Sequence, residues 1–264
     1  MGSSLKLITI NTWKGDGTYW ARLKLLKHQL QALKPDVVAC QEVFQAAGAD
    51  TGRDLADHLG MYYHGSSTRC KPRLFEGLIM ESCSGLGLLS QYPIVNTDTI
   101  KLPMNERDGE RTALFCQLDC DGTTVLVINT HLTHLYNGST LRKAQLQAIL
   151  AQVDLYEKDI PIFLCGDFNA DLHSDEIQYL LAHPTVSVHN LYQVGNGKQP
   201  CYTVVNQSGE PSAEGKSIDF IFSLSYNHSS HPHVTDARIV LDTPDEAGIY
   251  PSDHFGVMIQ AELS

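Results

Sequence analysis

The stretch IFLCGDFN (Ile162–Asn169) decides how the rest of the chain is interpreted, because an apolar run ends there in a group of polar side chains. Its first four residues have the composition of a short buried strand. Asp167 and Asn169 follow almost at once. A buried strand that carries a carboxylate and an amide at its end is how an α/β scaffold holds rigid polar groups at one rim of a sheet.

The same arrangement of an apolar run and a polar group recurs along the chain. Asn and Asp often end strands because they suit turns, so any one of these positions alone is weak evidence. Glu42 and His131 are not turn formers, however, and several strand ends would have to agree by chance. The polar residues in question are Asn11 after LITI, Glu42 after DVVACQ, His131 after VLVINT, Asp219 within SIDFIF, and Asp253 and His254 before the last apolar run.

The hydrophobic pattern between these positions predicts alternating strands and helices around a mostly β middle. Leucines three and four residues apart predict a helix over 19–33, with Thr18 as its N-cap. Asp121-Gly122 is the preferred type I′ turn pair and predicts a hairpin of 112–120 with 123–130. Further helices are expected over 51–59, after a cap at Ser139 and from Ser174, and further strands over 5–11, 36–41, 87–90, 162–165, 217–223, 237–241 and 255–263. With no repeat or linker, the sequence predicts an α/β fold in a single domain, residues 1–264.

The composition is typical of a globular protein with a substantial core, since 42% of the 264 residues are hydrophobic and 19% are charged. A formal net charge of −11 argues against a protein that covers long stretches of nucleic acid, although not against a nuclease with a local basic patch. No apolar run of about 18 residues is present, and the N-terminus lacks the apolar region of a signal peptide. Neither a membrane span nor a stable membrane anchor is therefore expected, and the oligomeric state is left open.

The seven cysteines are odd in number and show no C-x-x-C spacing. Cys40, Cys116 and Cys165 lie inside apolar runs, as small core residues do. These features favour a reduced, cytoplasmic protein. A disulfide between Cys70 and Cys83 remains an open alternative.

Six short motifs in a fixed order give the chain a resemblance to a known family. They are NTW (Asn11–Trp13), QEV (Gln41–Val43), NTHL (Asn129–Leu132), GDFN (Gly166–Asn169), SIDFIF (Ser217–Phe222) and SDHFGV (Ser252–Val257). Each is weak alone, but together they span almost the whole chain. The sequence resembles the endonuclease/exonuclease/phosphatase superfamily of metal-dependent phosphoesterases, which includes deoxyribonucleases and sphingomyelinases. The resemblance implies a four-layer α/β sandwich, in which helices flank two packed β-sheets.

Hydrolysis of a phosphodiester requires neutralised oxygens, an activated water and a proton for the leaving oxygen. Mg²⁺ usually keeps several waters and takes only one or two protein carboxylates, so a lone Glu can be its principal ligand. The resemblance implies that Glu42 is this ligand, with Asn11 and Asp253 near the metal or its waters and Mn²⁺ as the alternative ion. The metal would polarise a phosphoryl oxygen and stabilise charge on the leaving group.

The resemblance also implies roles for the other polar residues. Asp167 would orient and activate the attacking water, and Asn169 would donate its amide hydrogens to the phosphate or to the nucleophile. Asp219 would fix the tautomer of His254, and the sequence leaves open whether His254 or Asp167 is the base. His131 would donate to a non-bridging oxygen. The His in the NTHL motif makes the sequence similar, at this position, to four branches of the superfamily. These are sphingomyelinases, deadenylase-like enzymes, inositol-phosphate phosphatases and pancreatic-type deoxyribonucleases.

A few basic and aromatic residues are candidates for substrate binding. Arg111 lies just before a predicted strand and is a candidate phosphate contact, although an acidic stretch beside it would use part of its charge. Tyr136 follows the NTHL motif and is a second candidate. Arg69, Lys71 and Arg73 form a basic cluster that is either a substrate-phosphate loop or, more simply, a solvated loop.

The sequence thus predicts a Mg²⁺-dependent hydrolase that cleaves a phosphoester, a phosphodiester rather than a monoester, in a small molecule or lipid headgroup. The alternative in the same superfamily is a nuclease or DNA-end phosphodiesterase, which a basic rim around the pocket would favour. A catalytically silent binding protein is the third interpretation. It predicts erosion of the motifs, whereas every acid, amide and imidazole is present.

Overall fold

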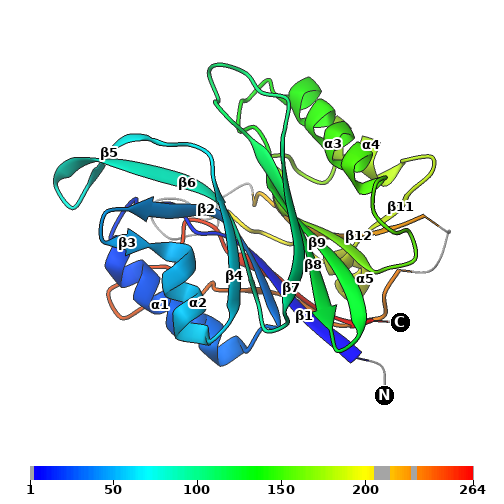
Figure 1. The fold of residues 1–264 in the computed structure, drawn as a ribbon, viewed down its shortest axis with the longest axis horizontal. Coiled ribbons are helices and arrows are strands. Elements are labelled where there is room, and N and C mark those ends of the chain that lie inside the picture. The colour runs from blue at the N-terminus through cyan, green and yellow to red at the C-terminus, as the bar shows by residue number, and fades with distance from the viewer. Residues whose placement is uncertain (1–2, 205–214, 227–230, 264) are drawn as a thin grey trace.

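The chain folds into four layers, in which helices cover the outer faces of two packed β-sheets (Figure 1). The computed structural model describes residues 3–204, 215–226 and 231–263. The four-layer α/β sandwich predicted from the sequence is confirmed.

The first sheet has eight strands and holds the N-terminal strand near its centre. Its strands β1 and β2 run parallel, and its other pairs are antiparallel. The order along its main path is β13 (Val234–Val240), β14 (Gly256–Leu263), β1 (Ser3–Asn11), β2 (Val37–Ala46), β6 (Leu78–Ser90) and β4 (Tyr62–Ser67), while β3 (Ala49–Asp50) pairs with β2 and β5 (Lys71–Phe75) with β6.

The second sheet has six strands, and only its strands β9 and β10 run parallel. Its order is β11 (Ser187–Asn190), β12 (Asp219–Ser225), β10 (Ile162–Asp167), β9 (Thr123–His131), β8 (Thr112–Cys120) and β7 (Ile94–Lys101). In each sheet the parallel pair therefore carries two of the polar groups noted in the sequence, Asn11 and Glu42 in the first sheet and His131 and Asp167 in the second.

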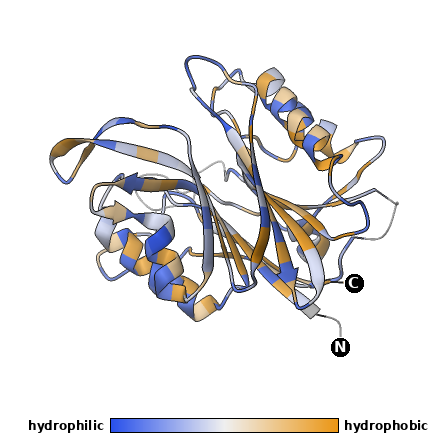
Figure 2. Cartoon of the chain, in the orientation of Figure 1, coloured by the Kyte–Doolittle hydropathy of each residue, from blue (hydrophilic) through white to orange (hydrophobic). Residues whose placement is uncertain are grey.

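Three apolar clusters hold the layers together. Strand β1 illustrates how alternation assigns side chains to them, because Leu5 and Leu7 enter the core between the sheets while Ile8 and Ile10 face the helices. Figure 2 shows hydrophobic residues along the central strands of both sheets. Helices α1 (Tyr19–Leu33) and α2 (Thr51–Leu59) cover the first sheet, α3 (Ser139–Val153) and α4 (Asp175–Leu181) cover the second, and the short α5 (Leu191–Asn196) contacts β12 and β13.

The helices agree closely with the sequence prediction. The helices predicted over 19–33 and 51–59 are confirmed to the residue, although the Thr18 side chain makes no capping hydrogen bond. The predicted cap at Ser139 is wrong, because Gly138 is the N-cap and Ser139 is the first helical residue, whose hydroxyl donates to Glu176. The turn at Asp121 and Gly122 has positive φ at both residues, as a type I′ turn requires.

The strands are longer and more numerous than predicted. Strand β2 continues to Ala46 instead of ending at Gln41, and β6 begins at Leu78 instead of Gly87. Strands β4, β5 and β7 were not predicted, because most of their side chains are exposed or half-buried and give no apolar run.

A disulfide joins Cys70 and Cys83 at the base of the hairpin formed by β5 and β6. This hairpin projects beyond the body of the first sheet (Figure 1). The expectation of fully reduced cysteines is therefore wrong for this pair, while Cys40, Cys116 and Cys165 are free and buried, as predicted.

Replacing both Cys70 and Cys83 with Ser is expected to lower the free energy of unfolding by about 3 kcal/mol, since the bond closes a short loop in the unfolded chain. Urea unfolding of the variant and the parent protein measures this difference. In denaturant the parent protein should expose five thiols before reduction, the number of free cysteines. Finding all seven cysteines of the chain reactive without a reductant would show that the bond does not form.

Candidate active site

A pocket of about 610 Å³ lies where the parallel strands of the two sheets end. Eight of the ten residues proposed from the sequence line it. Asp219 does not line the pocket, but its carboxylate is hydrogen-bonded to His254, which does. Tyr136 does not line the pocket, and its side chain is 98% exposed. The eight lining residues are Asn11, Glu42, Arg111, His131, Asp167, Asn169, Asp253 and His254.

Asp167 lies at the centre of this group and is 2% exposed. Its Oδ2 accepts a hydrogen bond from Asn11 Nδ2 at 3.0 Å, and its Oδ1 accepts one from the Asn169 N–H at 2.9 Å. Burial, and next the nearby Asp219 carboxylate, raise the pKa of Asp167 to about 6. The group is therefore mostly ionised at neutral pH and remains basic enough to accept a proton.

Gly166, the residue before Asp167, allows the backbone of β10 to approach strand β9 closely. Its φ is +144°, and a Cβ at this position would lie 1.9 Å from the carbonyl oxygen of Thr130. No other residue type fits this approach of β10 to β9, so the glycine of the GDFN motif has a structural reason.

His254 forms an ion pair with Asp219, whose Oδ2 lies 2.9 Å from His254 Nδ1. Burial alone would lower the pKa of His254, but the charge and hydrogen bond of Asp219 outweigh it and raise that pKa to about 10. At neutral pH the ring is consequently an imidazolium, whose Nε2 lies 3.9 Å from Asp167 Oδ2. Asp219 is fully buried, so the charge of His254 also stabilises the carboxylate.

His131 is in the opposite charge state. Its Nε2 lies 3.3 Å from Asp167 Oδ2. Burial, followed by the positive charge of Arg111, lowers the pKa of His131 well below the ordinary value. The pocket therefore contains one neutral and one cationic imidazole on two sides of the same carboxylate.

Glu42 is turned into the pocket by an irregularity in β2. The pairing of β2 with β6 shifts register between Cys40 and Val43, and Glu42 itself has a φ of +54°. A bulge of this kind re-aims a side chain, and a left-handed conformation in a residue other than Gly is typical of functional sites. Trp13, Lys14 and Asn169, which also line the pocket, have positive φ as well.

The oxygen-rich part of the pocket fits a divalent cation. Glu42, Asp253 and Asn11 line it together and supply the carboxylate and amide oxygens that Mg²⁺ prefers. Burial raises the pKa of Asp253, and the negative charge of Glu42 raises it further. A cation between these two carboxylates would relieve their repulsion. Lys14 partly does so, since its Nζ lies 3.0 Å from Glu42 Oε2.

Asp167, Asp219 and His254 also bring potential metal ligands close together. His254 Nδ1 and Asp219 Oδ2 are already at hydrogen-bond distance from each other, however. An ion between them would break this bond, and Mg²⁺ favours oxygen ligands over imidazole. Glu42 and its neighbours are therefore the better metal site.

Arg22 was not singled out from the sequence, although it holds the loop that follows Asn11. It is 3% exposed, and its guanidinium donates to the carbonyl oxygens of Thr12, Trp13, Lys14, Asp16 and Pro251. These bonds link the loop after β1 to the segment that carries Asp253. The available signal was its spacing, since Arg22 falls on the buried face of α1.

Basic residues form one side of the pocket. Arg111 donates two hydrogen bonds to the buried Asp108, at 2.8 and 2.7 Å, so the predicted local use of its charge is confirmed. Arg69, Lys71 and Arg73 line the pocket from the β5–β6 hairpin and the segment before it. The simpler interpretation of this cluster as a solvated loop is wrong about the loop, because Lys71 and Arg73 lie on strand β5. Lys71 is nevertheless exposed to solvent, and all three residues line the pocket.

The fold and this site define an α/β-sandwich protein with a polar pocket of the kind that metal-dependent phosphoesterases use. The sequence model of the Endonuclease/Exonuclease/phosphatase family matches residues 8–254, so the chain belongs to this family. The resemblance carried by the six motifs is thereby confirmed.

Individual relatives are distant. Rat (Rattus norvegicus) Nocturnin is 24% identical over 263 residues, which are 90% of this chain and 58% of the relative. Mouse (Mus musculus) 2′,5′-phosphodiesterase 12 is 22% identical over 219 residues, 72% of this chain and 36% of the relative. The chain thus spans about half the length of these relatives or less. The structure of D. rerio TDP2 complexed with single-strand DNA product has a TM-score of 0.75 and 20% identity, with 98% of each chain covered.

Asp219→Asn is expected to lower the pKa of His254 from about 10, because burial is then opposed only by the charges of Asp167 and Asp253. NMR of the imidazole resonances in metal-free protein measures this titration. The midpoint of the ring titration should lie at a lower pH in the variant than in the parent protein. In the parent protein, protonation of His254 stabilises the folded state at low pH, and this stabilisation is lost as the pH rises towards 10. The variant should lose part of this contribution to the free energy of unfolding. An unchanged His254 titration would contradict the assignment of Asp219 as its partner.

Proposed function

We propose that the chain is a Mg²⁺-dependent phosphodiesterase that cleaves a small-molecule phosphodiester by attack of water. The observation that carries this proposal is that Asp167, His131 and the Asp219–His254 pair converge beside Glu42 and Asp253 in one pocket. A pocket of about 610 Å³ has the size of a site for a nucleotide-sized ligand. The residues 1–264 would act as one domain.

In this proposal Asp167 is the base, because the pKa of His254 is raised to about 10 and leaves no free nitrogen at neutral pH. Asp167 accepts a proton from the attacking water as the water oxygen bonds to phosphorus. The bond from phosphorus to the leaving oxygen breaks, and that oxygen takes a proton from solvent. The His254 imidazolium and neutral His131 donate hydrogen bonds to phosphoryl oxygens, where negative charge increases in the transition state. Asn169 already uses one amide hydrogen on the Leu132 carbonyl oxygen, at 3.1 Å, and has a second one for the substrate.

Glu42, Asn11 and Asp253 would hold Mg²⁺, with Mn²⁺ as the alternative ion. When bound, such a cation neutralises phosphoryl oxygens and stabilises the leaving group. Arg111 would contact a phosphate. Tyr136 remains a weaker substrate-binding candidate because it lies outside the pocket.

We propose a cytoplasmic location because five cysteines are free and four of them are buried, so the chain is not a disulfide-rich one. No helix within the described residues is long and apolar enough to cross a membrane. The disulfide at the hairpin base is a reason against a reducing compartment, because such bonds usually persist in oxidising ones.

Hydrolysis of bis-p-nitrophenyl phosphate tests the metal site. Turnover should require Mg²⁺ or Mn²⁺ and stop in EDTA, and Glu42→Gln should lower kcat/KM by about 10²-fold or more while His254→Ala lowers it by a similar factor. Glu81→Gln is the matched control, because Glu81 is exposed on β6 and does not line the pocket. Equal activity of the parent protein and the Glu42→Gln variant would refute the metal assignment.

A nuclease or DNA-end phosphodiesterase is the second candidate, favoured by the basic rim of Arg69, Lys71 and Arg73. The names of two relatives, a 2′,5′-phosphodiesterase and TDP2 with a DNA product, also support a nucleotide-containing substrate. The names of these relatives give no comparable support for a lipid headgroup.

The salt dependence of cleavage decides between the two candidates. For a single-stranded oligonucleotide bound through three phosphate contacts, kcat/KM should fall by about 20-fold between 50 and 200 mM NaCl. The rate with bis-p-nitrophenyl phosphate, measured in parallel, should change little. A flat salt profile for the oligonucleotide, or no cleavage of it, would leave the small-molecule phosphodiesterase as the function.

A further inference from the structure

The three basic residues on the hairpin side of the pocket, Arg69, Lys71 and Arg73, differ in whether the protein supplies hydrogen-bond partners for their charged groups. Arg73 is committed to the protein, because its guanidinium donates to the carbonyl oxygens of Ser82 and Arg69 and to two serine hydroxyls. Lys71 is exposed to solvent. Arg69 is half-buried, lines the pocket, and has no side-chain partner among the residues that the structure describes.

Among the described residues no carboxylate forms an ion pair with Arg69, and Asp108 and Glu42 offset its charge only from farther away. Burial lowers the pKa of Arg69, and the nearby positive charge of Arg111 lowers it further. Arg111 itself is neutralised by Asp108 through two hydrogen bonds. A half-buried guanidinium that lacks an acceptor has an unfavourable free energy, which an anion in the pocket would remove.

The backbone of Arg69 is fixed in place. Its N–H donates to the Ser84 carbonyl oxygen at 3.1 Å, and the Ser84 N–H donates back to the Arg69 carbonyl oxygen at 3.2 Å. The Arg73 guanidinium donates to this same Arg69 carbonyl oxygen. The disulfide joins Cys70, which follows Arg69, to Cys83, which precedes Ser84. A donor held in this way loses little conformational freedom when it binds a ligand, which favours affinity.

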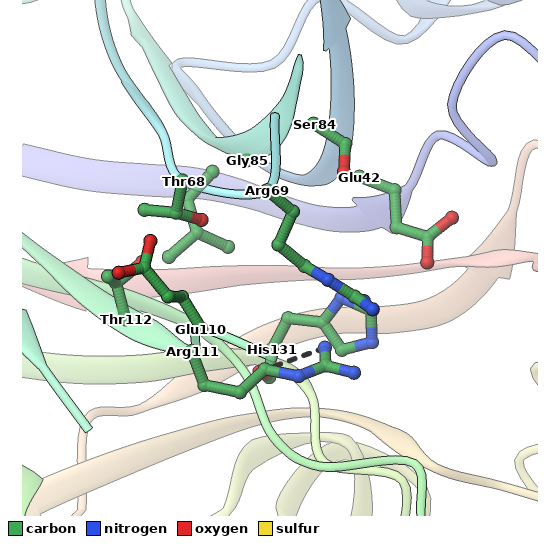
Figure 3. Close-up of a pocket in the computed structure, with 10 residues that line it drawn as sticks. Glu42, Thr68, Arg69, Ser84, Gly85, Glu110, Arg111, Thr112 and His131 are labelled. Atoms are coloured by element: carbon green, nitrogen blue, oxygen red, sulfur yellow. Dashed lines mark hydrogen bonds between the residues drawn. The ribbon is translucent and has the colours of Figure 1, made fainter. Parts of the chain in front are cut away.

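The position of Arg69 separates it from the reacting phosphate. Figure 3 shows Arg69 and Arg111 reaching towards His131 from two sides. The small cavity that Arg69 also lines is bordered by Glu42, Arg111 and His131, but not by Asp167, Asp253 or His254, so Arg69 lies on the flank of the pocket away from those three residues. The cavity of about 20 Å³ behind Arg69 has room for about one water, so an anion must bind on the side of the main pocket.

We infer that Arg69 forms a subsite for a second phosphate group of the substrate, which is bound beside His131 and is not cleaved. This inference rests on the proposed phosphoesterase function and narrows its substrate class to phosphodiesters that carry an additional phosphate. Arg69 is then a specificity-determining residue, because substrates without the second phosphate leave its charge without a partner.

Ligand binding tests the subsite without turnover or metal. In EDTA, calorimetry compares adenosine 5′-monophosphate with adenosine 3′,5′-bisphosphate and with ADP. The parent protein should bind at least one of the two diphosphorylated ligands about tenfold more tightly than the monophosphate. Arg69→Gln should bring this ratio to about one, and Arg69→Lys, which keeps the charge without the planar fork, should give an intermediate ratio.

Arg53→Gln is the charge-matched control, since Arg53 is exposed on α2 and does not line the pocket. Circular dichroism establishes that each variant is folded. A ratio that Arg69→Gln leaves unchanged would overturn the inference. Equal weakening of all three ligands would also overturn it, because Arg69 would then bind the reacting phosphate. Failure to hydrolyse bis-p-nitrophenyl phosphate would refute the proposed reaction instead, and the binding ratios would still decide the subsite.

Discussion

A buried pair of amide side chains, Gln41 on β2 and Asn129 on β9, joins the two sheets next to the pocket. Gln41 Nε2 donates to Asn129 Oδ1 at 2.7 Å, and Asn129 Nδ2 donates to the carbonyl oxygens of Cys40 and Gly87 at 2.9 and 3.0 Å. Both amides are fully buried. Gln41 Oε1 has no partner among the described residues, but the loss of any of these three hydrogen bonds would leave a further buried polar group unpaired. The amide pair therefore fixes the position of one sheet against the other.

The active-site geometry follows from this connection. Glu42 comes directly after Gln41, and His131 comes two residues after Asn129, so the amide pair sets how far apart a candidate metal ligand and a candidate catalytic imidazole lie. The hydrogen bond from Asn11 to Asp167 adds a second link between the sheets at 3.0 Å. The pocket thus lies between the two sheets, and the two links join residues that are 88 and 156 positions apart in the chain.

The residues of this candidate site were predictable from the sequence because they follow buried strands, whose apolar runs are the strongest local signal. The prediction from sequence failed where a feature depends on contacts between residues that are distant in the chain. The left-handed turn at Glu42 arises from the pairing of β2 with β6, and the strands β4, β5 and β7 have too many exposed side chains to form an apolar pattern. Arg22 is an intermediate case, because its place on the buried face of α1 was readable while its carbonyl partners were not.

The charge distribution explains how an acidic chain can hold an anionic substrate. The net charge is −11, yet the carboxylates of the pocket are offset by the imidazolium of His254, by Lys14 and by the arginines of the rim. Lys14 serves as a counter-ion for Glu42, and a divalent cation at Glu42 would take over this role and leave the ammonium group free for the phosphate. A pocket with low-dielectric walls and local positive charge attracts anions even when the protein as a whole repels them. A long nucleic acid would meet this local positive charge together with the net charge of −11 of the whole chain, whereas a small anion would meet chiefly the pocket.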